Sequence, residues 1–109
     1  MEFPLEISMS LSTNLKFLRK KKGFTQESLS ELLGISRSKL AGYELNINPP
    51  LETLVKISDQ LGVSIDILLR EDLTAYSEYK LRELLETDQF LRGRKLRILS
   101  TTVDAEGRE

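Results

Sequence analysis

The sequence lacks two residue types that carry much of protein chemistry, because its 109 residues include no cysteine and no histidine. This excludes thiol nucleophiles, Cys/His zinc sites, axial haem histidines and imidazole acid–base catalysis. It also excludes disulfide bonds, which favours a reducing compartment over secretion. Tryptophan is absent and only three prolines occur. This composition favours small helices packed by aliphatic side chains.

Long hydrophobic runs are missing as well. No apolar segment approaches the ~18 residues that indicate a transmembrane helix, and Glu2 and Glu6 stand where a signal peptide would need positive charge. The sequence has no glycine-rich phosphate loop and no cluster of metal ligands. We therefore expect a cytoplasmic protein that makes no membrane contact, is not an enzyme and holds no cofactor or metal.

The net charge of −1 conceals an uneven distribution of charge. Residues 14–45 carry seven Lys or Arg against three Glu, whereas residues 46–91 carry four against nine Asp or Glu. Residues 92–97 read R-G-R-K-L-R and are basic again. A basic block of this size indicates either a face that contacts a polyanion or a solvated helix surface, and charge alone does not separate the two.

The N-terminal third predicts an arm followed by a helix. Residues 1–9 alternate apolar and polar side chains, which is typical of a partly disordered arm or an edge strand. From about residue 10, Leu11, Leu15 and Leu18 fall on one face of a helix. Gly23 follows three lysines and is suited to end that helix.

Four shorter helices are predicted next, each opened by a residue suited to a helix start. They are expected at residues 26–33 after Thr25, 37–45 after Ser36, about 50–61 with Pro50 at its first position, and 65–70 after Ser64. Gly34 and Gly62 end the first and third of these helices. The predicted core is Leu15, Leu18, Leu29, Leu33, Leu40, Tyr43, Leu54 and Ile57, joined by Leu51 and Leu61, with Leu32 as a further candidate.

The remaining residues change in character. Residues 74–86 are predicted to form a sixth helix with Leu81, Leu84 and Leu85 on its apolar side, and residues 87–93 are expected to break it. Residues 95–103 have the alternation of a strand. A single strand is not stable in water, so it needs a partner strand from another chain or from a part of the protein outside this sequence.

The segment from Thr25 to Leu45 predicts a helix-turn-helix, since Gly34, Ile35 and Ser36 form a three-residue corner between two short helices. Arg37 and Lys39 are expected to project from the start of the second helix, the end that reaches base edges in such proteins. Other helical hairpins share this spacing.

The wider pattern is more specific. N-L-K-F-L-R-K-K-K-G-F-T-Q-E-S-L-S-E-L-L-G-I-S-R-S-K-L-A-G-Y-E-L-N, followed by P-P-L-E-T-L-V-K-I-S-D-Q-L-G-V-S-I-D-I-L-L, resembles the lambda-repressor-like (XRE/Cro) family without gaps. The resemblance implies an all-α fold, a five-helix DNA-binding bundle, to which this chain adds a C-terminal helix and a strand-like tail. We predict an N-terminal arm over residues 1–9, a DNA-binding domain over residues 10–72 and a dimerisation or linker tail over residues 73–109.

The resemblance also implies which residues contact DNA. They are Thr25, Gln26, Ser36, Arg37, Ser38, Lys39 and Asn46. Gln26 matches a family position that contacts a phosphate or a base, and an arginine such as Arg37 can bond guanine through two atoms. Arg19 and Glu44 match an ion pair that ties the first helix to the third, which we interpret as structural.

Five residues depart from the family pattern. Gly42 stands where a long polar residue often reaches the bases, and Leu45 with Asn46 replaces the usual Asn-Gly. Pro50 replaces a residue that is frequently polar, and Ser30 one that is usually alanine. These departures lower the number of expected base contacts.

The tail carries a second resemblance. T-D-Q-F-L-R-G-R-K-L-R-I-L-S-T-T-V-D is similar to the connector that leads into a LexA-like C-terminal domain in some bacterial repressors, which implies a longer regulator. The alternative is a complete short protein whose strand pairs across a dimer.

Together these patterns predict a sequence-specific regulator of transcription. We expect a nucleoid-associated repressor that binds double-stranded DNA as a homodimer and inserts the helix over residues 36–45 into the major groove. Two alternatives stay open. One is an antitoxin whose tail, from Thr74, masks a toxin, and the other is an interaction module that has lost DNA binding.

Overall fold

The computed structural model describes the backbone of residues 3–92 and the side chains of residues 10–92. Seven helical segments make up the regular structure of this part of the chain. The segments are α1 (Phe3–Lys21), α2 (Gln26–Leu33), α3 (Arg37–Tyr43), α4 (Leu51–Leu61), α5 (Ile65–Arg70), the 3-10 helix η1 (Leu73–Ala75) and a helix over residues 78–92. No β-strand occurs within residues 3–92, so this part of the chain is all-α. The strand predicted at residues 95–103 lies outside the described residues.

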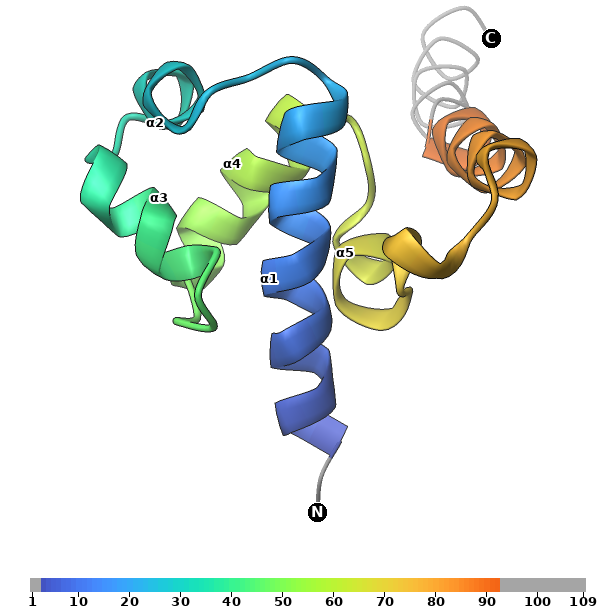
Figure 1. The fold of residues 1–109 in the computed structure, drawn as a ribbon, viewed down its shortest axis with the longest axis horizontal. Helices are drawn as coiled ribbons and strands as arrows, with labels where there is room; N and C mark the ends of the chain where they lie inside the picture. The colour runs from blue at the N-terminus through green and yellow to red at the C-terminus, as the bar shows by residue number, and fades with distance from the viewer. Residues whose placement is uncertain (1–2, 93–109) are drawn as a thin grey trace, which may run out of the picture.

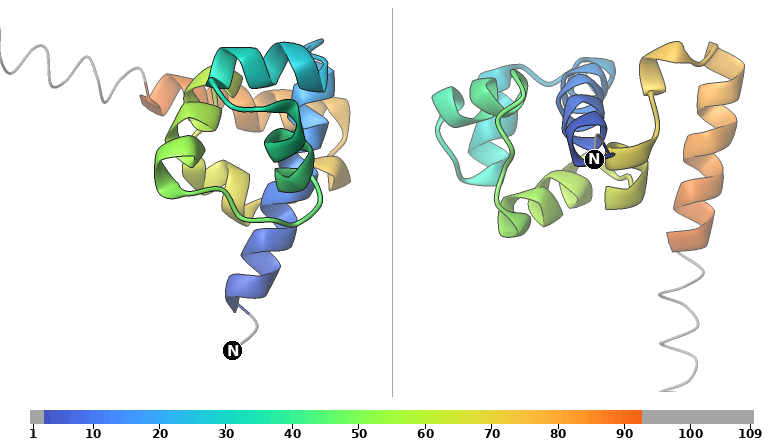
Figure 2. Two further views of the ribbon diagram at one scale, coloured as in Figure 1. Left: turned by 90° about the vertical axis from the view of Figure 1, so that its left-hand side faces the viewer. Right: turned by 90° about the horizontal axis from the view of Figure 1, so that it is seen from below.

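The helices are arranged around α1 (Figure 1). α2 and α3 lie on one side of α1, and α5 and the 78–92 helix lie on the other. α4 packs against α2 and α5, and the loop over residues 44–50 connects it to α3 (Figure 2). The chain therefore presents α2 and α3 together on a side that the 78–92 helix leaves open.

Aliphatic burial holds the bundle together. The core cluster is Leu11, Leu15, Leu18, Leu29, Leu33, Leu40, Tyr43, Leu54, Ile57, Leu61, Val63, Ile67, Leu68, Leu73 and Leu81. All eight residues of the predicted core, from Leu15 to Ile57, are in this cluster. Full burial of one leucine contributes about 1.5–3 kcal/mol, so these side chains are the main source of stability.

Two further apolar residues that the sequence placed in the core are exposed instead. Leu51 is 72% exposed and Leu32 is 52% exposed, whereas Leu61 is buried as predicted. Pro50 is the N-cap of α4 and not its first helical residue. This shift leaves Leu51 at the first position of the helix, where its side chain stays exposed although Leu54 and Ile57 are buried.

The first helix starts earlier than the sequence indicated. α1 begins at Phe3, whereas residues 1–9 were expected to form an arm and the helix to start near residue 10. The alternation that suggested a strand covers too few residues to fix a period of two. Pro4 is compatible with the first turn of a helix, because its missing N–H has no partner there.

The helix after η1 also differs from its prediction. It covers residues 78–92, where the sequence indicated residues 74–86 and a break at 87–93. The Ser77 hydroxyl accepts the Lys80 N–H at 3.2 Å and fixes the start. Near the predicted break, the Asp88 carboxylate accepts the backbone N–H of Ser64 at 3.0 Å. A tertiary contact thus supports the helix where the local sequence favours a turn.

Tyr76 lies in the connection between η1 and the 78–92 helix. Its hydroxyl donates to the Glu71 carboxylate at 2.5 Å. This hydrogen bond, together with partial desolvation and the nearby charges of Glu71 and Asp72, raises the pKa of Tyr76 above its ordinary value of 10.0. The connection is therefore held by a neutral tyrosine over the whole physiological pH range.

Candidate nucleic-acid interface

The corner between α2 and α3 is fixed by a cap on each side. The Thr25 hydroxyl accepts the Ser28 N–H at 2.9 Å, and the Ser28 hydroxyl accepts the Thr25 N–H at 2.9 Å, which forms a capping box. Gly34 ends α2 with φ 72°, a left-handed conformation that strongly favours glycine. The Ser36 hydroxyl accepts the Lys39 N–H at 3.1 Å and starts α3. These contacts set the direction of both helices.

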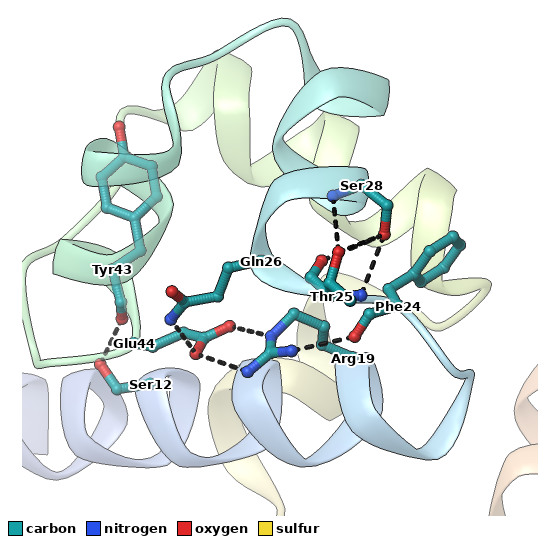
Figure 3. Close-up of polar contacts among 8 residues, drawn as sticks. All are labelled: Ser12, Arg19, Phe24, Thr25, Gln26, Ser28, Tyr43 and Glu44. Atoms are coloured by element: carbon teal, nitrogen blue, oxygen red, sulfur yellow. Dashed lines mark hydrogen bonds and ion pairs between the residues drawn. The ribbon is translucent and has the colours of Figure 1, made fainter.

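A shared carboxylate ties this corner to α1 (Figure 3). Glu44 receives two hydrogen bonds from Arg19, from Nε to Oε2 at 2.6 Å and from Nη2 to Oε1 at 3.2 Å. Gln26 donates through Nε2 to Glu44 Oε1 at 3.1 Å, and Arg19 Nη1 donates to the Phe24 carbonyl at 2.9 Å. The Arg19 and Glu44 side chains are only 8% and 3% exposed. One buried carboxylate therefore connects α1, the start of α2 and the end of α3.

A second anchor holds the end of α3. The Ser12 hydroxyl donates to the Tyr43 carbonyl at 2.7 Å and accepts the Asn46 N–H at 2.9 Å. Asn46 has φ 74°, in the left-handed region that asparagine tolerates better than most residues. α3 ends at Tyr43, two residues before the predicted end. In the last turn of α3, a Cβ at Gly42 would lie 3.1 Å from Ile47 Cδ1, so a glycine here lets the following loop fold back against the helix.

The predicted DNA contacts divide into two groups in space. Thr25, Gln26 and Arg37 line one open hollow of about 490 Å³, together with Arg19, Phe24 and Glu27. Ser38 and Lys39 are exposed on the first turn of α3, next to Arg37. Ser36 is exposed and caps the same turn. Asn46 is exposed at the opposite end of α3 and does not line the hollow.

The charged side chains of the first turn of α3 have no partner among the described residues. Arg37 and Lys39 are exposed, and neither forms an ion pair with any side chain of residues 10–92. Only the backbone N–H of Lys39 is used, by the cap. Two unpaired cations beside a hollow form a surface suited to the phosphates and base edges of a duplex.

Sequence reasoning missed several buried polar residues, among them Ser12 and Asn14. Asn14 donates through Nδ2 to the carbonyls of Leu68, at 2.9 Å, and Glu71, at 2.5 Å, and its Oδ1 accepts the Leu73 N–H at 3.0 Å. The one available signal was a polar residue beside an apolar stripe. That signal gives no indication of partners more than 50 positions away in the chain.

The fold and this surface together define a helix-turn-helix DNA-binding protein. Comparison with known proteins agrees. A helix-turn-helix family model matches residues 15–68. The chain is 37% identical over 78 residues to YonR, an uncharacterized HTH-type transcriptional regulator derived from prophage SPbeta in Bacillus subtilis (strain 168), in a match that covers 71% of this chain and 69% of YonR.

A second relative and a solved structure extend the comparison. The chain is 42% identical over 65 residues to the HTH-type transcriptional regulator ImmR of the same strain, covering 59% of this chain and 51% of ImmR. A solved SinR–SinI protein complex contains a chain similar over 91% of this one and 99% of its own length, with a TM-score of 0.58 and 27% identity. The chain belongs to the XRE, or lambda-repressor-like, family of helix-turn-helix transcriptional regulators. These regulators bind DNA and are not enzymes.

Within residues 3–92, no helix combines the length and the apolar character that crossing a membrane requires. The same part of the chain contains no group of three or more acidic side chains placed to hold a metal ion.

Proposed function

We propose that the protein is a repressor that binds operator DNA as a homodimer and reads it with the first turn of α3. The observation that carries this proposal is the unpaired state of Arg37 and Lys39 on a helix whose other end is anchored. A regulator bound over a promoter blocks other proteins from that DNA sterically. Repression therefore requires no further protein-binding surface. Binding to chromosomal DNA places the protein on the nucleoid, in the cytoplasm.

The geometry supports a role for six of the seven candidate residues. Arg37 is positioned to bond guanine in the major groove, and Lys39 to bond guanine or a phosphate. Gln26 uses one N–H on Glu44, which leaves its second N–H and its carbonyl oxygen for DNA. Thr25 and Ser36 lie at helix starts, where backbone and hydroxyl groups favour phosphate. Asn46 contacts the DNA backbone beyond α3.

Arg37→Ala tests the role of α3 in recognition. Bound sequences are first selected from random duplex DNA with the unchanged chain. We expect the variant to bind the selected site about 1–3 kcal/mol more weakly and to lose preference at one base pair, as for an arginine that contacts guanine. Binding isotherms and a repeated selection measure both effects.

Arg82→Ala is the matched control for this experiment. Arg82 is also exposed and unpaired among the described side chains, but it belongs to the 78–92 helix on the other side of α1. The Arg82→Ala variant should therefore keep the affinity and the sequence selectivity of the unchanged chain for DNA. Equal affinity of the Arg37→Ala variant and the unchanged chain, with an intact helical spectrum, would refute a recognition role for α3.

The 78–92 helix supports the dimer part of the proposal. Tyr79, Phe90 and Leu91 are 73%, 62% and 56% exposed on it, a large apolar exposure for one helix. We expect Phe90→Glu to convert a dimer into a monomer, because a charge replaces an apolar contact. Sedimentation of the full chain measures this, with Leu32→Glu as a control at an exposed leucine of α2. If the Phe90→Glu variant stays dimeric, the dimer is made elsewhere, for example by a LexA-like C-terminal domain of a longer protein.

A second candidate function is regulation by a protein partner that binds the same helix. The observation that favours it is the likeness to a chain solved in a SinR–SinI complex, which extends over 91% of this chain. An antitoxin whose tail masks a toxin belongs to the same class. Such a partner would be captured by the unchanged chain and lost with Phe90→Glu, while Arg37→Ala would leave the capture intact.

A further inference from the structure

The loop after α3 places an aliphatic side chain over a glycine of that helix. A Cβ at Gly42 would lie 3.1 Å from Ile47 Cδ1, and 3.9 Å from both Cβ and Cγ1 of the same isoleucine. Ile47 therefore occupies the space that a side chain at position 42 would fill. Because Ile47 is still 60% exposed, it covers the glycine without entering the core, and it offers an apolar group to whatever approaches α3.

Hydrogen bonds of the loop backbone hold Ile47 in this position. The Gly42 carbonyl accepts the N–H of Leu45 at 2.9 Å and the N–H of Ile47 at 3.0 Å. Between them, the N–H of Asn46 donates to the Ser12 hydroxyl at 2.9 Å. The N–H groups of residues 45, 46 and 47 are therefore all bonded to α3 or α1. An apolar group that is already fixed in place loses little conformational freedom when it binds a ligand.

The covered glycine lies on the same side of α3 as an exposed residue of its first turn. Ser38 precedes Gly42 by four residues, which places the two on one side of the helix. At 3.6 residues per turn, both lie nearly opposite Leu40, which is buried in the core. Ile47 thus extends the outward surface of the first turn of α3 by one further turn. The loop lies on the side of the molecule that presents α2 and α3 (Figure 2, left).

The chemistry of the loop favours one kind of contact with a duplex. Residues 45–50 read L-N-I-N-P-P and carry no charge. Phosphates are bound by cations and by hydrogen-bond donors, and the Ile47 side chain is neither. In the major groove the base edges present hydrogen-bonding groups and a single apolar group, the C5 methyl of thymine. An aliphatic side chain gains free energy against that methyl group, but leaves a polar base edge without a partner.

We propose that Ile47 contacts the C5 methyl group of a thymine and makes the chain prefer that base. This inference rests on the proposed function, because it requires α3 to lie in the major groove. Gly42 has no side chain with which to contact DNA, and the loop supplies one in its place. Recognition then includes an apolar contact from beyond the end of α3, in addition to the polar contacts proposed for Arg37 and Lys39.

Replacing thymine by deoxyuridine tests the contact, because deoxyuridine pairs with adenine in the same way and lacks only the methyl group. Each thymine of the site selected from random duplex DNA is replaced in turn. Binding isotherms are then measured with the full unchanged chain and with Ile47→Ala. We expect replacement of the contacted thymine to weaken binding of the unchanged chain about fourfold, the effect of burying one methyl group. The same replacement should leave the affinity of Ile47→Ala unchanged.

Val55→Ala is the matched control. Val55 is 42% exposed on α4, and its variant should keep the fourfold dependence on the methyl group. Because Ile47 is exposed, Ile47→Ala should retain the helical spectrum and the melting temperature of the unchanged chain, so that a difference in binding reports the contact.

Three results overturn the thymine contact. The first is a set of replacements that affect Ile47→Ala as much as the unchanged chain, as expected if Ile47 lies against deoxyribose. The second is a selected site that contains no thymine. In both cases sequence-selective binding persists, and the proposed function stands. The third is a chain that selects no DNA sequence, which contradicts the proposed function and removes the thymine contact with it.

Discussion

Glu44→Gln is expected to lower the free energy of unfolding by about 3–5 kcal/mol, because it leaves the buried Arg19 guanidinium without a counter-charge. Glutamine keeps the size of the side chain and one of its oxygens, so the loss reflects charge more than packing. For a chain of this size the melting temperature should fall by more than about 10 °C. Thermal unfolding followed by circular dichroism measures the change.

Glu78→Gln is the matched control. Glu78 pairs with Lys21 at 3.2 Å, but its side chain is 77% exposed, so water screens the pair and the expected cost is below about 1 kcal/mol. Because Glu44 also orients Gln26, Glu44→Gln should weaken DNA binding even well below its melting temperature. Unchanged stability with abolished DNA binding would show that the pair acts in recognition and not in folding.

Asn14→Asp is expected to have the second large effect, a loss of about 3 kcal/mol or more. The side chain is fully buried and its amide donates to two backbone carbonyls, those of Leu68 and Glu71. A carboxylate of the same shape has no hydrogen to donate and carries a charge into the interior. Each buried carbonyl left without a partner costs about 1–3 kcal/mol, and the buried charge adds to that cost.

Asn48→Asp makes the same chemical change at an exposed loop position and should leave stability nearly unchanged. Urea unfolding of both variants beside the unchanged chain gives the comparison. Because Asn14 joins α1 to α5 and η1, the Asn14→Asp chain should also lose part of the ordered packing of the 78–92 helix. Native-like stability in Asn14→Asp would mean that the interior adapts to a charge at this position.

The short helices of the DNA-binding bundle could be predicted because their ends are marked by local chemistry. Thr25, Ser36 and Ser64 each place a hydroxyl on the backbone N–H three residues later. Gly34 and Gly62 supply the left-handed residues that end α2 and α4. Where cap, glycine and apolar spacing agreed, the predicted boundary fell within two residues of the observed one.

The prediction failed where distant contacts decide the structure. The Asp88 carboxylate reaches the backbone of Ser64, 24 residues away, and no local pattern signals this bond. The partners of Ser12 and Asn14 lie more than 30 positions along the chain. The DNA contacts inferred from the family pattern stay a prediction. The same pattern indicated the Arg19–Glu44 pair but not the bond from Gln26 to the same carboxylate, because that junction needs three elements to be folded together.

The anchoring of α3 has a consequence for how this regulator can diverge. Stability at α3 depends on Leu40 and Tyr43, in its second half, and on Glu44, its C-cap, whereas the side chains of Arg37 and Lys39 contribute no described intramolecular bond. Under the proposed role of Arg37 and Lys39 in recognition, a duplicated copy of the gene could exchange these two residues, and with them its operator, at almost no cost in folding. The same separation makes positions 37 and 39 the natural sites for building a library of altered specificity on an unchanged scaffold.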